Sequence, residues 1–250
     1  MRHVLLIGGG TNTGKTLALI HIAVLCPGSK IAIFDADGQV KDTVEEQGLQ
    51  LPNLEVIMAT PDWEELTGNY RRIKATFGSN DYVCFDMLGR FWDFSQNYYS
   101  RSVFGKSPAQ HIIELKRQAS RTDFGGFDGL TDWTVIKRLH NEELLDDACL
   151  WSPFNVVATT SLEPYSPKEK LPKTGVEGLI AQEFNTKLEG EKHNRYRFRN
   201  IAILYKRIPD WKLCFKLVKL KDTQTLPLAE HEFSGNPFFQ VYCEKRGILL

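Results

Sequence analysis

The sequence predicts an α/β fold, in which helices flank a mostly parallel central sheet and an antiparallel hairpin lies at one edge of that sheet. Three observations support this prediction. A glycine-rich loop joins an apolar run to a helical segment at the start of the chain. Short apolar runs then alternate with segments of helical periodicity. Late in the chain, two strand-like runs flank Ile208-Pro209-Asp210, a spacing that indicates a hairpin.

The glycine-rich loop lies between the apolar residues 4–7 and 17–20 and matches the phosphate-binding pattern G-x-x-x-x-G-K-[ST] in full. Its residues are Gly9, Gly10, Thr11, Asn12, Thr13, Gly14, Lys15 and Thr16. In such a loop the backbone N–H groups and the dipole of the following helix bind phosphate oxygens. We expect Lys15 to reach the β- and γ-phosphates of ATP or ADP, and the Thr16 hydroxyl to ligate Mg²⁺. The alternative is a glycine turn with a solvated Lys15.

Composition excludes several classes of protein. The 250 residues include 31 basic and 31 acidic side chains, so the formal net charge of zero creates no global field that attracts nucleic acid or membranes. The five cysteines (Cys26, Cys84, Cys149, Cys214 and Cys243) form no C-x-x-C pair, which argues against a disulfide framework or a zinc site. No apolar run approaches the roughly 18 residues of a membrane span, and the early phosphate loop leaves no room for a signal peptide. We therefore expect a cytoplasmic protein, in the host cytoplasm if it is viral.

Two acidic residues follow the second predicted strand. After a helix over residues 15–25, the largely apolar residues 30–34 predict a buried strand that ends on Asp35-Ala36-Asp37. Carboxylates at the carboxyl end of a parallel strand face the ligand crevice of an open α/β sheet. The alternative is that Asp35 or Asp37 caps a turn.

A further carboxylate has the pattern of the second nucleotide-binding motif. Residues 54–59 predict a third strand and residues 63–77 a helix, and residues 81–88 then contain an apolar run that ends on Asp86. In nucleotide-binding proteins a carboxylate at such a strand end holds the Mg²⁺ shell. Asp86 is therefore the second candidate metal ligand, beside Thr16.

Residues 89–151 are predicted to be mostly helical, with a glycine-rich break at residues 122–129. The break is either a mobile substrate loop or a connector. The first part carries an aromatic cluster, whose members are Phe91, Trp92, Phe94, Tyr98, Tyr99 and Phe104. Packing against the sheet explains these rings, and stacking on nucleic-acid bases is the alternative.

The later chain is predicted to be less regular. Residues 155–158 form a strand that ends on Thr159-Thr160-Ser161, and residues 163–200 are polar without strong periodicity. This segment is either a functional loop, with lysines and arginines for nucleic acid, or a solvated surface loop whose acids offset them. Residues 223–250 show no clear period.

The order of these features resembles the core of the RecA-like recombinase ATPases and of their small phage-encoded relatives. The resemblance covers roughly residues 3–222. It rests on the phosphate loop, strands ending in Asp35-Ala36-Asp37, in Asp86 and in Thr159-Thr160-Ser161, and a late hairpin ending in Lys219-Leu220-Lys221.

The resemblance implies roles for several residues. Asp37 falls where the family has a glutamate that orients the attacking water, and Asp86 falls on the aspartate of the Mg²⁺ shell. Thr160 falls where the family usually has a glutamine that senses the γ-phosphate. Lys219 and Lys221 match paired lysines that reach the ATP of the neighbouring subunit. The alternative for both lysines is a solvent-facing edge strand.

The resemblance also implies a function. It is that of a Mg²⁺-dependent ATPase in phage-type DNA replication or recombination, a homo-oligomer with ATP at subunit interfaces that binds single-stranded DNA or a DNA-processing partner. Residues 1–222 would form the core, residues 163–200 a mobile or partner-binding insertion, and residues 223–250 an extension. The alternatives are a DNA-packaging or helicase-type motor, a non-hydrolysing structural protein, and a small-molecule kinase. Arg117, Arg121 and Arg138 are spread too widely for the arginine-rich lid of such a kinase.

Overall fold

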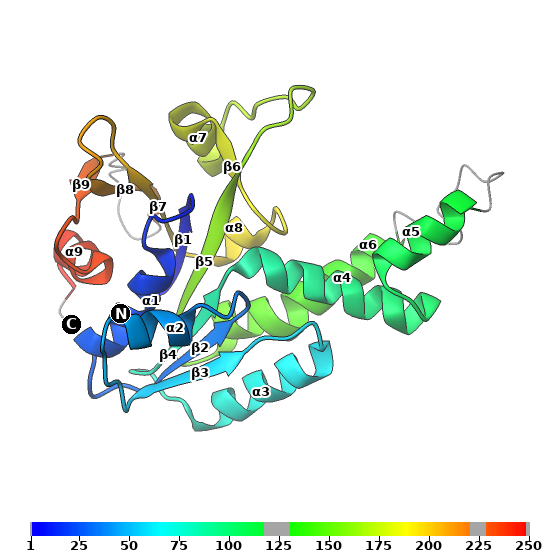
Figure 1. The fold of residues 1–250 in the computed structure, drawn as a ribbon, viewed down its shortest axis with the longest axis horizontal. Coiled ribbons are helices and arrows are strands. Elements are labelled where there is room, and N and C mark those ends of the chain that lie inside the picture. The colour runs from blue at the N-terminus through cyan, green and yellow to red at the C-terminus, as the bar shows by residue number, and fades with distance from the viewer. Residues whose placement is uncertain (1, 118–130, 221–228, 249–250) are drawn as a thin grey trace.

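The computed structural model describes residues 2–117, 131–220 and 229–248 (Figure 1). Within these residues a sheet of nine strands forms the centre of the molecule, in the order β3-β2-β4-β5-β1-β7-β8-β9, with β6 paired to β5. The strands are β1 (Val4–Gly9), β2 (Ile31–Asp35), β3 (Leu54–Met58), β4 (Tyr82–Asp86), β5 (Asn155–Pro164), β6 (Thr186–Leu188), β7 (Asn200–Lys206), β8 (Leu213–Leu220) and β9 (Glu230–Glu232). The predicted α/β fold with a mostly parallel sheet is confirmed, because β3, β2, β4, β5, β1 and β7 all pair in parallel.

Helices cover both faces of the sheet. They are α1 (Lys15–Leu25), α2 (Val40–Glu46), α3 (Trp63–Thr76), α4 (Leu88–Phe104), α5 (Pro108–Arg117), α6 (Thr131–His140), α7 (Gly175–Phe184), α8 (Asn194–Arg197) and α9 (Phe238–Lys245), and α6 continues into the π-helical turns η1 (Asn141–Leu145) and η2 (Asp147–Trp151). No helix of the described ranges combines the length and the apolar character that a membrane crossing requires.

The strand sequences explain why the sheet is covered on both sides. Successive side chains of a strand point to opposite faces. Val4 and Leu6 belong to one apolar core, with side chains of α3, α4, η1 and η2. Leu5 and Ile7 belong to the other core, with side chains of α1 and α9. A strand that is apolar at every position must be buried on both faces, which is the arrangement of a parallel sheet.

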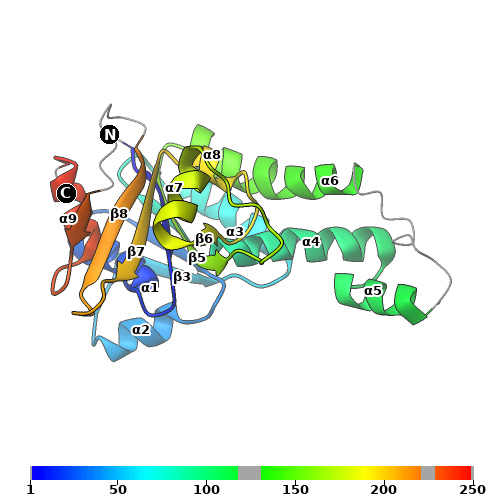
Figure 2. The same ribbon diagram turned by 90° about the horizontal axis from the view of Figure 1, so that it is seen from above.

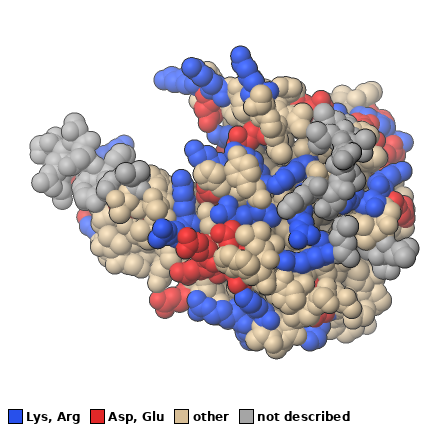
Figure 3. Space-filling view, turned by 180° about the vertical axis from the view of Figure 1, so that it is seen from behind, with Lys and Arg blue, Asp and Glu red and all other residues tan. Residues whose placement is uncertain are grey.

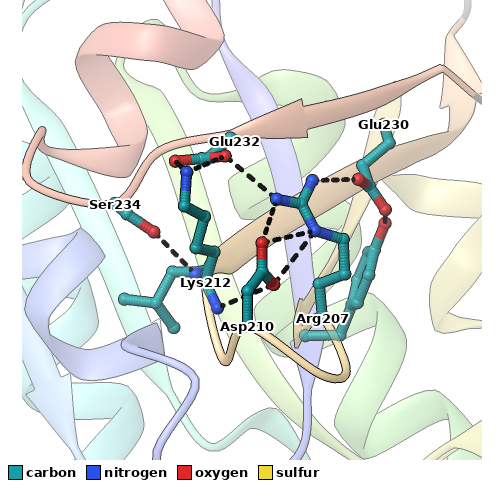
Figure 4. A network of polar contacts seen from close by, with 8 residues as sticks. Arg207, Asp210, Lys212, Glu230, Glu232 and Ser234 are labelled. Carbon is teal, nitrogen blue, oxygen red and sulfur yellow. Dashed lines mark hydrogen bonds and ion pairs between the residues drawn. The ribbon is translucent and has the colours of Figure 1, made fainter.

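The predicted hairpin is present at the edge of the sheet. β7 pairs with β8 in antiparallel register, and β8 pairs with β9. Charged side chains join the hairpin turn to β9 (Figure 4): Arg207 Nη1 lies 2.6 Å from Glu230 Oε1, and Lys212 Nζ lies 2.9 Å from Glu232 Oε1. Arg207 also pairs with Asp210 inside the turn. These ion pairs connect the edge strand β9 to the turn between β7 and β8.

Helices α4, α5 and α6 project from one side of the sheet, as the two perpendicular views show (Figures 1 and 2). The end of α4 that is nearest the sheet is apolar, and its Phe91 and Phe94 are buried. Trp133 of α6 is partly exposed. The predicted packing role of the early aromatic residues therefore holds for the base of α4. The glycine-rich break expected at residues 122–129 lies outside the described residues.

The prediction of an irregular segment over residues 163–200 is wrong in part. This segment contains α7, β6 and α8, and β6 pairs in antiparallel register with the end of β5 through Leu162–Leu188 and Glu163–Lys187. β5 itself extends to Pro164, well beyond the predicted strand. Short elements stabilised by distant pairing leave little periodic signal in the local sequence.

The final segment is also more ordered than its sequence indicates. Phe238, Phe239 and Tyr242 of α9 are almost completely buried and belong to the same core as α1. The apolar residues of α9 follow one another too closely for a clean helical period, because this short helix is covered on several sides.

Candidate functional site

The phosphate loop joins β1 to α1 and has the backbone conformation that its glycines allow. Gly14 has φ 86° immediately before α1, a left-handed conformation that favours glycine. A side chain at Gly9 is also excluded, because its Cβ would lie 2.5 Å from Thr13 Oγ1. The loop amides can therefore approach a phosphate group closely at the N-terminus of α1.

The Lys15 ammonium group folds back over the loop. Its Nζ donates to the carbonyl oxygens of Gly9 and Gly10 at 3.0 Å and 2.8 Å. Burial lowers the pKa of Lys15, and the carboxylates of Asp86, Asp37 and Glu189 oppose that shift. Lys15 thus lies in a partly desolvated position within the field of three acidic side chains.

Thr16 and Asp86 are brought together, although seventy positions separate them in the sequence. The Thr16 Oγ1 donates to Asp86 Oδ2 at 2.8 Å, and Thr159 Oγ1 donates to Asp86 Oδ1. Burial raises the pKa of Asp86, while the two hydroxyl donors lower it. The contact is possible because β1, β5 and β4 are parallel neighbours in the sheet. Their carboxyl ends therefore lie on the same side of the molecule.

The donors at this point fit Mg²⁺. Magnesium prefers oxygen ligands and is usually bound by one or two carboxylates together with substrate phosphates and water. Thr16 and Asp86 supply a hydroxyl and a buried carboxylate next to the phosphate loop. The described part of the chain contains no group of three or more His, Cys, Asp or Glu side chains arranged for a metal ion.

The two acidic residues after β2 have different surroundings. Asp35 is fully buried, and its carboxylate accepts from the backbone N–H groups of Asp37, Gly38 and Val40. Asp37 is partly exposed, and its Oδ1 lies 3.6 Å from Arg90 Nε. The capping alternative therefore holds for Asp35, whereas Asp37 faces the side of the sheet that carries Lys15.

The remaining predicted residues lie at different distances from the loop. Thr160 is buried on β5, and its Oγ1 donates to the carbonyl oxygen of Glu189 at 3.0 Å. The Nζ of Lys219 donates to the carbonyl oxygens of Arg195 and Phe198 of the same chain, both at 2.6 Å. In this structure the Lys219 ammonium group is thus bound to backbone carbonyls of its own chain. Lys221 lies outside the described residues.

Three residues of the site were not identified from the sequence. Thr159 binds Asp86, Arg90 lies beside Asp37 in the first turn of α4, and Glu189 follows β6. The position of Arg90, four residues after the acid of the second nucleotide-binding motif, is a signal that sequence reasoning could have used. Glu189 carries no such signal, because only the pairing of β6 with β5 brings it to the site.

A cavity of about 710 Å³ adjoins this edge of the sheet. Its walls come from α4, α6 and the segment 163–195, and they include Thr160 and Glu189. Trp92 and Trp133 stack at its border, with ring centroids 6.0 Å apart and an interplanar angle of 24°. The cavity therefore touches the same residues that lie beside the phosphate loop.

Three of the eight basic residues of the segment 163–200 form ion pairs. Lys187 Nζ lies 2.8 Å from Glu169 Oε1, and Arg197 Nε lies 2.6 Å from Asp146 Oδ1. Arg195 pairs with Glu177. Lys and Arg are interleaved with Asp and Glu on the face seen in Figure 3. These pairs stabilise the segment and reduce its net positive charge.

No protein-family model and no curated protein matches the chain. Solved structures that are similar to it include the following two. One is a KaiC-like protein, PH0186, from the hyperthermophilic archaeon Pyrococcus horikoshii OT3, with 14% identity over 93% of this chain and 85% of that one, and a TM-score of 0.49. The other is the RadB recombinase, with 18% identity over 93% of this chain and 88% of that one, and a TM-score of 0.45. These values carry no activity over to this chain.

Proposed function

We propose that the protein is a Mg²⁺-dependent ATPase of the RecA-like type that acts on DNA. The observation that carries the proposal is the meeting of a complete phosphate loop with Asp86 at the ends of β1 and β4, through the 2.8 Å contact between Thr16 and Asp86. A solvated glycine turn would not require a buried carboxylate beside the hydroxyl that follows its lysine.

Each residue of the site has a part in binding ATP. The loop amides and the dipole of α1 hold the phosphates, and Lys15 exchanges its two carbonyl acceptors for phosphate oxygens. Thr16 and Asp86 hold Mg²⁺, which when bound neutralises charge on the β- and γ-phosphates. Thr160 responds to the γ-phosphate through its bond to the Glu189 carbonyl. Both residues of this hydrogen bond, Thr160 and Glu189, line the cavity.

The cavity is the proposed contact with single-stranded DNA. The stacked Trp92 and Trp133 offer flat apolar surfaces of the kind on which bases stack. Among the described residues of its walls, five basic side chains are balanced by five acidic ones, so the stacked rings carry this part of the proposal rather than net charge. Because the net charge of the chain is zero, any electrostatic attraction to DNA must come from a local group of basic side chains.

Assembly into a homo-oligomer with ATP at the subunit interface is part of the proposal. The contacts of Lys219 within its own chain add a condition to the proposed role of this lysine at the interface. For Lys219 to reach the ATP of another subunit, its Nζ must first leave the carbonyls of Arg195 and Phe198. We propose that this exchange accompanies assembly.

The central experiment measures the ATPase rate with and without single-stranded DNA over a range of protein concentrations. We expect stimulation by single-stranded DNA and a specific activity that rises with concentration. Stimulation by duplex DNA alone would favour a packaging or helicase-type motor. A basal rate of zero under all conditions would favour a structural nucleotide-binding protein.

The first variant for this experiment is Lys15→Ala. We expect the rate to fall by about 100-fold or more, because the charge that faces the phosphates is lost. Lys41→Ala is the matched control, since Lys41 is an exposed lysine of α2 away from the loop, and it should keep the wild-type rate. Hydrolysis at the wild-type rate by Lys15→Ala would contradict the proposed function.

A further inference from the structure

The backbone of Glu189 is fixed to the end of β5, the strand that lies beside β1. Its N–H donates to the carbonyl oxygen of Ser161 at 3.0 Å, and its carbonyl oxygen accepts from Thr160 Oγ1. Ser161 in turn lies opposite Gly9, the first residue of the phosphate loop, in the pairing of β1 with β5. Glu189 is therefore one strand away from the loop.

The side chain of Glu189 lies against the start of α4. A Cβ added at Gly89 would lie 2.8 Å from Glu189 Cδ and 3.0 Å from its Oε1, so only glycine at position 89 permits this contact. Gly89 is three residues after Asp86. The carboxylate thus lies between the end of β5 and the start of α4, which is close in sequence to the candidate metal ligand.

Charged side chains of β5 and α4 surround the Glu189 carboxylate: Glu163 of β5, and Arg90 and Asp93 of α4. Glu189 contributes to the field at Lys15, and Arg90 and Ser161 stabilise its carboxylate. Burial and the neighbouring Glu163 have the opposite effect and raise the pKa of Glu189 overall. A carboxylate with raised proton affinity is a better proton acceptor near neutral pH.

Asp37, the residue that the sequence resemblance assigns to the attacking water, is the competing carboxylate. It also contributes to the field at Lys15, but it follows β2 rather than a strand next to β1. Its carboxylate lies 3.6 Å from the guanidinium group of Arg90. Its side chain is also one methylene shorter than that of Glu189.

We propose that Glu189 is the carboxylate that accepts a proton from the attacking water during ATP hydrolysis. In this step the water oxygen forms a bond to the γ-phosphorus, and the bond from that phosphorus to the β–γ bridging oxygen breaks. ADP leaves with the electron pair of that bond. The proton of the water passes to Glu189 and then to solvent, and the products are ADP and inorganic phosphate. The inference rests on the proposed ATPase function.

The test compares Glu189→Gln with wild type in two assays, equilibrium binding of ATP and the rate of hydrolysis. We expect ATP affinity within about threefold of wild type and a fall in kcat of about 100-fold or more, the size of a lost general base. The nucleotide recovered from the variant after incubation should be ATP. Glu189→Asp, which keeps a carboxylate one methylene further back, should recover part of the rate.

Two further variants serve as controls. Glu55→Gln removes an exposed carboxylate of β3 that pairs with Arg72 outside the cavity, and it should retain kcat. Asp37→Asn should lower kcat less than Glu189→Gln does. In wild type, kcat should fall on the acidic side of a pKa above the ordinary glutamate value, and this acidic limb should be absent from the residual activity of Glu189→Gln.

The proposal would be overturned by a wild-type kcat in Glu189→Gln, by loss of ATP binding in that variant, or by a larger defect in Asp37→Asn. Failure of the proposed ATPase function has a different signature. In that case wild type itself does not hydrolyse ATP, or Lys15→Ala hydrolyses it normally.

Discussion

At the scale of single residues, Asp35 and Asp37 show how two identical side chains acquire different functions two positions apart. Asp35 is buried and accepts three backbone N–H groups, which close the turn after β2. Asp37 lies outside that turn and faces Arg90. The sequence motif is the same for both, and only the direction of each side chain separates a structural residue from a candidate functional one.

Asp35→Ala should therefore destabilise the fold. The substitution leaves three backbone N–H groups without their acceptor, and we expect the free energy of unfolding to fall by about 3 kcal/mol. Urea denaturation followed by circular dichroism measures the change. Asp37→Ala is the matched control and should change stability by less than about 1 kcal/mol, because an exposed ion pair contributes little. Equal losses in the two variants would contradict the capping role.

At the scale of elements, the buried His140 contacts both the segment 163–200 and the projecting helix α4. We call this set of contacts the His140 junction. His140 at the end of α6 has its Nε2 3.2 Å from Asn194 Oδ1 at the start of α8, and its ring meets Trp92 of α4 edge-on. Burial lowers the pKa of His140 to about 4. The junction therefore requires a neutral imidazole.

This junction predicts a dependence of stability on pH. Above pH 6.5, the ordinary pKa of histidine, His140 is neutral in both the folded and the unfolded chain. The burial of its ring then makes the free energy of unfolding no more dependent on pH. As the pH falls from 6.5 toward 4, the unfolded chain binds a proton that the folded chain does not, which removes about 3 kcal/mol of stability. His3, whose pKa is also lowered to about 4 by burial, acts in the same direction.

Urea denaturation at pH 7, 6 and 5 measures this dependence. His140→Gln should lower stability at pH 7 but show a flatter decline between pH 7 and pH 5 than wild type, because His3 alone remains of the two. Identical pH slopes in the two proteins would show that the junction tolerates a charged imidazole.

At the scale of the whole molecule, the two ends of the chain meet in one core. α9 packs against α1, and its Phe239 and Tyr242 lie close to His3 at the start of the first strand. Tyr242 Oη also accepts from Asn200 Nδ2 at the start of β7. Residues 229–248 are therefore part of the same hydrophobic core as β1 and α1.

Phe239→Ala tests how much this packing stabilises the fold. Removal of a fully buried aromatic side chain should lower the free energy of unfolding by about 3–5 kcal/mol and the ATPase activity only in proportion to the folded fraction. Gln240→Ala, whose amide contacts only Glu244 of the same helix, should leave stability nearly unchanged. Thermal unfolding of the two variants measures the difference. A wild-type melting temperature in Phe239→Ala would mean that α9 is dispensable for the core.

The sequence by itself determined the features that depend on neighbouring residues. These are the phosphate loop with its flanking strand and helix, the apolar strands of the parallel sheet, the strand that ends on Asp86, and the edge hairpin. Each is encoded within about ten residues, where turn chemistry and hydrophobic period act directly. The sequence also assigned Thr16 and Asp86 to one candidate Mg²⁺ site, although it did not predict the direct contact between them.

Only the tertiary structure decided which distant groups join the loop. The pairing of three-residue β6 with β5 brings Glu189 to the site, the carbonyls of Arg195 and Phe198 engage Lys219, and burial of α9 orders the final segment. None of these depends on a local pattern. Each depends on the free energy of contacts between segments far apart in the chain, which exists only once the sheet has formed.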